Sequence, residues 1–214
     1  MKEDILEQLI EGWYVTNSGW FVKHNIKYRP DKEHIDYDSK KDSVHSDIDI
    51  LAFSPKEKKS NNVHEISCKS WQSGLDLKNL YEIINKDATY NNNKQPGFQK
   101  REEWKNFREL VSDKWISDFV NKIEEETGRR FFTYKIAVTK LKNKDLYLDK
   151  IINNSMIHNR YKVNNAQIKI EILELHEIIN QTLTRLEKKE TAALEMTEIG
   201  RFLQLIKTAN MNII

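Results

Sequence analysis

Two strand-forming segments, separated by a short polar turn, constrain the fold of this 214-residue chain more than any other feature. Residues 47–53 read Asp-Ile-Asp-Ile-Leu-Ala-Phe, and residues 63–71 read Val-His-Glu-Ile-Ser-Cys-Lys-Ser-Trp. Both are rich in β-branched and aromatic residues, which pack well on a pleated surface. The segment between them begins with Ser-Pro and continues with polar residues, which favours a turn. We therefore predict that the two segments pair as antiparallel strands of one sheet.

The rest of the chain alternates between helical and extended patterns. Apolar residues recur every three to four positions over residues 101–126, which predicts one long helix or two abutting helices with Trp115 on the buried face. Similar patterns predict helices over 5–13, 145–156, 175–186 and 194–207, and strands over 20–28, 131–138 and 167–173. Hairpins mixed with crossover helices indicate an α/β fold with a mixed central β-sheet flanked by helices. The length suits a single domain with one buried core.

Composition limits the classes of protein to which the chain can belong. The formal net charge is only +2, so any nucleic-acid-binding face must be local rather than a property of the whole surface. A single cysteine, Cys68, rules out an internal disulfide and suits a reducing compartment. No apolar run approaches the roughly 18 residues of a membrane span, and the first residues do not read as an export signal. We therefore expect a soluble cytoplasmic protein with no membrane partner.

Charged residues occupy alternate positions on the two paired segments. Because successive side chains of a strand point to opposite faces, Asp47 and Asp49 are expected to share one face. By the same rule, Glu65, Ser67 and Lys69 share one face of the next strand. Acids that face inward are costly to bury alone, so a compensating partner such as a divalent cation is expected. Carboxylate oxygens suit Mg²⁺ or Mn²⁺, and the sequence therefore predicts a metal site where these faces meet.

The residues on these strands resemble the motif of a known family. The run Asp49-Ile50-Leu51-Ala52, followed on the next predicted strand by Glu65-Ile66-Ser67-Cys68-Lys69, is similar to the PD-(D/E)XK nuclease superfamily of restriction endonuclease-like and Holliday-junction resolvase-like proteins. The resemblance implies an αβββαβ core, here over residues 1–140. Residues 141–214 would then be a C-terminal addition of one strand and helices, which either packs on the core within a single domain or forms a homodimer contact.

The resemblance also implies roles for individual residues. Asp49 would bind Mg²⁺ or Mn²⁺ directly, and Lys69 would lie near the attacking water. The backbone carbonyl of Cys68 would be a further metal ligand. Glu11, in preference to Glu7, would match the acid that some branches of the superfamily contribute from the first helix.

The chain departs from the family pattern at Ser67, because an acidic residue is usual two positions before the lysine. A neutral hydroxyl group is a weak Mg²⁺ ligand compared with a carboxylate. Glu65 lies one pleat further along the same face, about 7 Å away by strand rise, and is the candidate to replace the missing acid. The predicted catalytic residues are Asp49, Glu65, Ser67 and Lys69, and the predicted metal ligands are Asp49, Glu65, the Cys68 carbonyl and Glu11.

Four further residues are candidates for nucleic-acid contacts. Trp71 and Gln72 follow the lysine directly and are predicted to line a nucleic-acid groove, although Trp71 suits the core equally well. Lys100 and Arg101 are predicted to bind phosphates. The leading hypothesis is a metal-dependent nuclease that hydrolyses DNA phosphodiester bonds, with RNA as an alternative substrate.

Two other functions stay open. The first is a catalytically degenerate nuclease fold that binds nucleic acid or a protein partner without cutting, which Ser67 would explain. The second is a nucleotidyltransferase in which Asp47 and Asp49 form an Asp-x-Asp metal pair. The nucleotidyltransferase fold requires a glycine-containing phosphate loop about ten residues upstream, and residues 36–46 contain no glycine.

Overall fold

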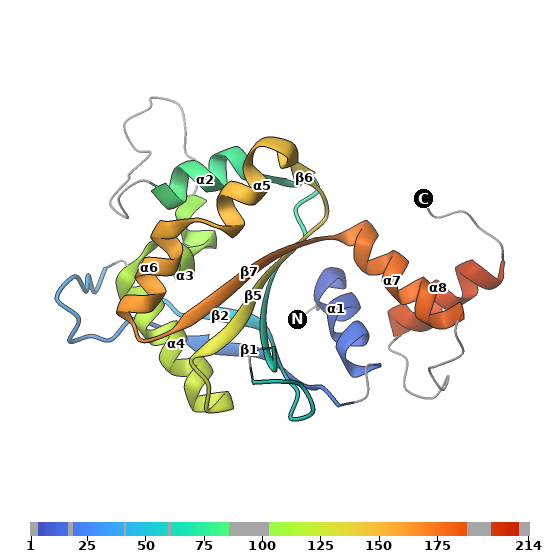
Figure 1. The fold of residues 1–214 in the computed structure, drawn as a ribbon, viewed down its shortest axis with the longest axis horizontal. Helices are drawn as coiled ribbons and strands as arrows, with labels where there is room; N and C mark the ends of the chain where they lie inside the picture. Colours follow the sequence, from blue (N-terminus) through green and yellow to red (C-terminus); the bar gives the residue numbers. More distant parts are fainter. Residues whose placement is uncertain are drawn as a thin grey trace.

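The computed structural model describes residues 4–16, 19–40, 42–59, 61–85, 103–187 and 198–209 (Figure 1). Lys100 and Arg101, two of the predicted phosphate-binding residues, lie outside the described residues, as does the start of the helix predicted over 194–207.

A mixed sheet forms the centre of the protein. In the described part of the chain its five strands lie in the order β1 (Phe21–Tyr28), β2 (Ser46–Phe53), β3 (Val63–Lys69), β5 (Phe131–Val138) and β7 (Gln167–Glu174). The pairs β1–β2 and β2–β3 are antiparallel, whereas β3–β5 and β5–β7 are parallel. The prediction of an α/β fold with a mixed central sheet is therefore confirmed, as is the antiparallel pairing of the two segments that constrain the fold most.

Helices cover both faces of this sheet (Figure 1). On one face lies α1 (Ile5–Val15), against which α7 (Leu175–Glu187) and α8 (Glu198–Thr208) pack. The helices of the other face are α2 (Leu77–Asn85), α3 (Arg108–Val111), α4 (Asp113–Thr127), α5 (Lys144–Ile152) and α6 (Ser155–Val163). Two apolar clusters result, one on each side of the sheet, and Trp115 lies fully buried in the larger one as predicted.

Two predicted helices are interrupted. The segment predicted as one long helix or two abutting ones contains a 3-10 turn (Glu103–Asn106), α3 and α4, and Ser112 breaks it with extended backbone angles of φ −126° and ψ 116°. The helix predicted over 145–156 divides into α5 and α6 because the carboxamide oxygen of Asn154 accepts hydrogen bonds from the amides of Met156 and Ile157. Side chains that cap a new helix compete with continuation of the preceding one.

The helices α7 and α8 pack against α1 of the same chain. Ile178 of α7 is buried in the same cluster as Leu6 and Ile10 of α1. In α8, Leu203 is buried, whereas Phe202 is 59% exposed. In the described part of this region, β7 extends the sheet by one strand, and α7 and α8 pack against α1.

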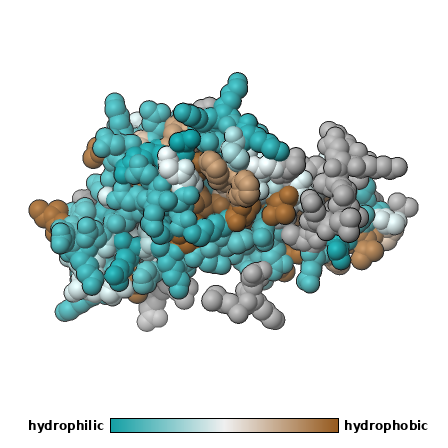
Figure 2. Space-filling view, turned by 90° about the horizontal axis from the view of Figure 1, so that it is seen from below, coloured by the Kyte–Doolittle hydropathy of each residue, from teal (hydrophilic) through white to brown (hydrophobic). Residues whose placement is uncertain are grey.

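The surface is polar over most of the face shown in Figure 2, with apolar side chains gathered near its middle. Within the described residues, none of the helices combines the length and the apolar character that a membrane span requires.

A tight turn after β3 depends on Gly74. This residue has φ 75° and precedes the short strand β4 (Leu75–Asp76), which pairs in parallel with β6 (Leu141–Lys142). A Cβ atom at Gly74 would lie 2.6 Å from the carbonyl oxygen of Lys140. The two short strands can approach closely because position 74 carries no side chain.

Gly74→Ala is expected to lower the free energy of unfolding by at least about 2 kcal/mol, since it combines left-handed strain with a backbone clash. Gly128→Ala is the matched control, because Gly128 also has a positive φ, of 67°, but a Cβ there meets nothing within 4 Å. That control is expected to lose about 1 kcal/mol from strain alone. Urea denaturation of both variants measures the difference, and equal losses would show that the clash is relieved at no cost.

Candidate active site

Asp49 and Lys69 form the centre of the site. The Oδ2 atom of Asp49 on β2 lies 3.6 Å from the Nζ atom of Lys69 at the end of β3. The same oxygen accepts a hydrogen bond of 2.7 Å from the backbone amide of Cys68. The register of the two strands, in which Ile50 is opposite Ile66, brings these groups together. The predicted acid and the predicted lysine therefore share one location.

The regular alternation of side chains between the two faces of the sheet is interrupted in β2 at Asp49. Ile48 is buried in the cluster beneath α4, whereas Ile50 is buried in the cluster beneath α1 on the opposite face. On the neighbouring strand β1, Asn25 lies opposite this point and has a positive φ of 51°. Asparagine adopts left-handed backbone more readily than most residues. Strict alternation does not hold through this point, and Asp47, expected on the same face as Asp49, is exposed.

The acid of α1 that interacts electrostatically with Asp49 is Glu7, whereas the favoured Glu11 pairs with a histidine. Glu11 lies 3.0 Å from the ring Nε2 of His24. Burial raises the pKa of Glu7 from its ordinary 4.5 to about 7, and the negative charge of Asp49 contributes next. Glu7 and Asp49 are thus two carboxylates that repel each other in a partly desolvated space. This is the electrostatic setting that a bound cation relieves.

The raised pKa of Glu7 predicts a specific dependence of stability on pH. Because the folded protein holds the Glu7 proton more tightly than the unfolded chain, the stabilisation from this proton is complete below pH 4.5 and is lost as pH rises through about 7. Glu7→Gln is expected to remove this part of the profile. Thermal unfolding in EDTA from pH 4 to about pH 9 measures it. Parallel profiles for the two proteins would show that Glu7 has an ordinary pKa.

Glu65 and Ser67 lie deeper than the Asp49–Lys69 pair. Both are buried, with Glu65 only 2% exposed. Burial raises the pKa of Glu65 well above its ordinary value, and the charges of Glu109 and Asp49 raise it further. Within the described residues, no hydrogen-bond donor reaches its Oε2 atom. The acid predicted to replace the missing carboxylate is therefore buried, with one oxygen atom that accepts no hydrogen bond from the described residues, and it interacts electrostatically with Asp49.

Sequence reasoning missed a second buried acid, Glu109 of α3. Its carboxylate accepts hydrogen bonds from the hydroxyl groups of Tyr134 and, at 3.4 Å, Tyr28. The hydroxyl group of Tyr161 donates to the backbone carbonyl of Glu109 at 2.7 Å. The signal in the sequence is a lone acid between the apolar residues Phe107, Leu110 and Val111, all of which are buried.

Lys69 balances this group of acids. Burial alone would lower the pKa of Lys69, but the negative charges of Asp49 and then Glu109 raise it above its ordinary value. Its ammonium group also lies 6.0 Å from the centre of the Phe107 ring. Lys69 is therefore held as a cation at the end of β3, partly exposed and next to an aromatic wall.

Trp71 and Gln72 follow in the turn beyond β3. Gln72 is exposed, whereas Trp71 is partly buried and packs edge-on against Phe107, with ring centres 6.1 Å apart. The Trp71 ring packs on the core and also lines a pocket, and its contact with nucleic acid stays a prediction. Cys68 is partly buried, and burial raises the pKa of its thiol.

No protein-family model, curated protein or solved structure matches the chain. Across the described ranges from residue 4 to residue 209, no group of three or more His, Cys, Asp or Glu side chains is arranged to hold a metal ion. Mg²⁺ is often bound by only one or two carboxylates, with water and substrate phosphate completing its shell. The hard oxygen atoms of Asp49 and Glu7, which repel each other, fit that mode of binding.

Proposed function

We propose that this protein is a metal-dependent nuclease that hydrolyses DNA phosphodiester bonds at the Asp49–Lys69 pair. The observation that carries the proposal is the 3.6 Å contact between an acid and a lysine on adjacent strands, with a second carboxylate, Glu7, repelled by the first. Phosphate hydrolysis needs an anionic cation-binding group beside a positive charge that stabilises the substrate oxygens. These two requirements are met within one patch at the end of β3.

The order of elements supports the same function. Reading α1, β1, β2, β3, α4 and β5 along the chain gives the αβββαβ order that the resemblance to the PD-(D/E)XK superfamily implies. The segment containing β4, α2 and α3 is inserted between β3 and α4. Asp49 and Lys69 lie on β2 and β3, the strands on which the resemblance places the metal ligand and the lysine.

The side chains of the site have separate tasks in this mechanism. Asp49 and Glu7 would hold a hydrated Mg²⁺ or Mn²⁺, which when bound lowers the pKa of water and offsets phosphate charge. Lys69 donates hydrogen bonds to the phosphate oxygens on which negative charge develops. Asp49 also keeps Lys69 in place, and the Cys68 amide keeps Asp49 in place. A carboxylate fixed by two strands loses little freedom when it binds a ligand.

The direct test is cleavage of supercoiled plasmid, a branched junction and single-stranded DNA with Mg²⁺, with Mn²⁺ and with EDTA. The expected result is cleavage with metal only, reduced at least about 100-fold in Lys69→Met. Lys27→Met on β1 is the matched control, because Lys27 is an exposed lysine outside the site. Metal-independent cutting, or equal loss in both variants, would contradict the proposal.

A second function is favoured by one observation. Ser67 supplies no carboxylate, and the described residues lack a three-member ligand group, so a nuclease fold that binds nucleic acid without cutting it is the alternative. This alternative predicts strongly salt-dependent DNA binding and no cleavage with either metal. The same plasmid assay, combined with binding measurements at two salt concentrations, separates the two functions.

A further inference from the structure

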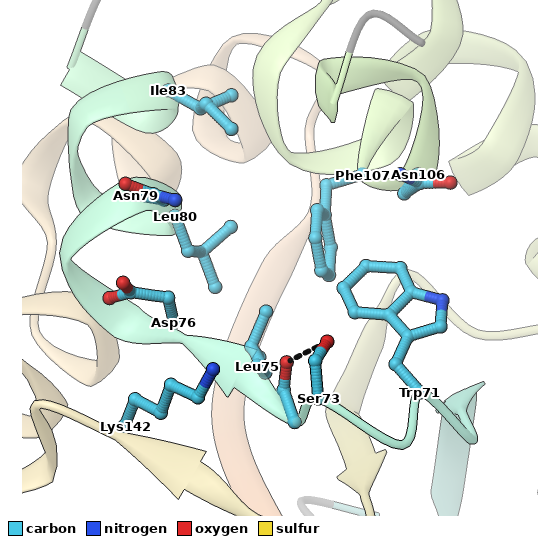
Figure 3. Close-up of a pocket in the computed structure, with 11 residues that line it drawn as sticks. Trp71, Ser73, Leu75, Asp76, Asn79, Leu80, Ile83, Asn106, Phe107 and Lys142 are labelled. Carbon is cyan, nitrogen blue, oxygen red and sulfur yellow. Dashed lines mark hydrogen bonds between the residues drawn. The ribbon is translucent and has the colours of Figure 1, made fainter. Parts of the chain in front are cut away.

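A preformed pocket of about 470 Å³ lies beside the candidate active site. One wall consists of Asn79, Leu80 and Ile83 on α2, and the facing wall carries the rings of Trp71 and Phe107 (Figure 3). This volume falls within the range of small-ligand sites, roughly 300 to 1,000 Å³. A flat group that enters the pocket would lie between aromatic and aliphatic side chains.

The aromatic wall is held rigidly. The carbonyl of Trp71 accepts hydrogen bonds from the Thr139 hydroxyl and, at 2.9 Å, from the Gly74 amide. Phe107 is only 2% exposed and packs edge-on against Trp71. The amide of Leu75, which lines the floor, donates to the Lys140 carbonyl at 2.9 Å. The pocket therefore exists before any ligand arrives, which reduces the entropy lost on binding.

The pocket and the candidate active site share one wall. The Phe107 ring lines the pocket, and its centre lies 6.0 Å from the ammonium group of Lys69. A single side chain, Phe107, therefore lies next to the ammonium group and also lines the pocket. A strand with a phosphate at Lys69 can reach the pocket with one of its own bases or that of a neighbouring nucleotide.

The chemistry of the pocket suits an uncharged planar ligand. Its lining residues include one acid, Asp76, and one base, Lys142, so they carry no excess charge for a phosphate or a carboxylate. The carboxamides of Asn79 and Asn106 offer both donors and acceptors, as the edge of a nucleobase requires.

We propose that this pocket binds one unstacked nucleobase of the strand that lies at Lys69, so that the substrate is single-stranded or locally unpaired nucleic acid. The base stacks on Trp71, and Asn79 reads its edge. Enzymes that hold a base in this way bind it between aromatic and apolar side chains. The inference rests on the proposed function for the position of the strand, but binding of the base requires no metal and no cleavage.

Binding in EDTA tests this inference. Labelled single-stranded DNA, the same strand with single abasic sites placed at successive positions, and the blunt duplex of the same sequence are compared by fluorescence anisotropy. The single strand is expected to bind about 10-fold more tightly than the duplex, and an abasic site at one position is expected to cost about 10-fold. Trp71→Ala and the pocket-filling Ile83→Trp are each expected to remove both differences.

Trp71→Ala removes one wall of the pocket, whereas Ile83→Trp fills it, so the two variants test the pocket independently. Ile83 is on α2 and not part of the aromatic wall, so a folding defect in Trp71→Ala leaves the filled variant as evidence. Phe202→Ala on α8 is the matched control for an exposed aromatic ring outside the site and is expected to keep both differences. Equal binding of single strand and duplex, or unchanged preferences in a folded Ile83→Trp protein, would overturn the pocket assignment.

The outcomes for the two proposals are distinguishable. If the wild-type protein cuts no DNA with Mg²⁺ or Mn²⁺ but keeps the single-strand preference in EDTA, the base pocket stands and the nuclease proposal fails. If it cuts blunt duplex DNA and the pocket variants bind all DNA forms like wild type, the nuclease proposal stands and the pocket fails. Equal, salt-dependent binding of every DNA form would assign the contact to the phosphate backbone alone.

Discussion

Asp49→Asn is expected to reduce metal-dependent DNA cleavage at least about 100-fold, because even groups that only orient a metal ligand are worth about 10- to 100-fold. The variant keeps a side-chain oxygen that can accept the hydrogen bond from Cys68, so the local backbone is expected to hold. It removes the charge that contributes most to raising the pKa of Lys69, and that pKa is expected to fall. Plasmid cleavage under single-turnover conditions measures the loss.

Asp47→Asn is the matched control for that result. Asp47 is an exposed acid on the same strand, two residues before Asp49. The nuclease proposal expects little change in cleavage from this substitution. A nucleotidyltransferase would need both acids as metal ligands, so a comparable loss in the two variants, together with tight Mg²⁺-dependent binding of a nucleoside triphosphate, would favour that function instead.

Glu109→Ala is expected to lower the free energy of unfolding by about 4 kcal/mol, because each buried hydroxyl group left without an acceptor costs roughly 1 to 3 kcal/mol. The two hydroxyl groups are those of Tyr134 and Tyr28, which donate to the Glu109 carboxylate. Urea denaturation at pH 7 measures the loss. Cleavage by the remaining folded protein is expected to fall as well, since Lys69 loses a negative neighbour.

Glu109→Gln separates hydrogen bonding from charge. Glutamine keeps an acceptor oxygen for a tyrosine hydroxyl group but carries no negative charge. It is expected to lose less than half of the stability that Glu109→Ala loses, while lowering the pKa of Lys69 to a similar extent. If the two variants are equally unstable, the charge rather than the hydrogen bonds accounts for the contribution of Glu109.

The parts of the fold that follow a strong periodic pattern could be predicted from the sequence. The strands at 46–53, 131–138 and 167–174 lie within a residue or two of their predicted positions because their alternating or continuous apolar patterns match their burial. The helix break at Asn154 was missed, whereas the break at Ser112 falls within the predicted alternative of two abutting helices. The break at Asn154 depends on a single polar side chain that caps α6, and periodicity does not report such capping.

The strand-borne part of the site could be predicted from the sequence, whereas the residues that helices contribute could not. Asp49 and Lys69 come together because strand register follows from the hydrophobic pattern. Glu7 and Glu11 lie one helical turn apart, and the periodic pattern alone does not tell which of them faces Asp49. Glu109 and Phe107 come from a segment about 40 residues beyond the strands, and only the folded chain shows that it lies against them.

The packing of α7 and α8 on α1 joins an early segment of the chain to late ones. Glu7 is near the start of the chain, yet the helix that carries it is clamped by Ile178 and its neighbours, which are synthesised much later. A growing polypeptide on the ribosome therefore lacks the support for its N-terminal acid until the segment up to residue 208 has emerged. The packing around Glu7 is therefore completed only after α8 has been synthesised, and cleavage at Asp49, if the proposed function holds, is expected only from that point.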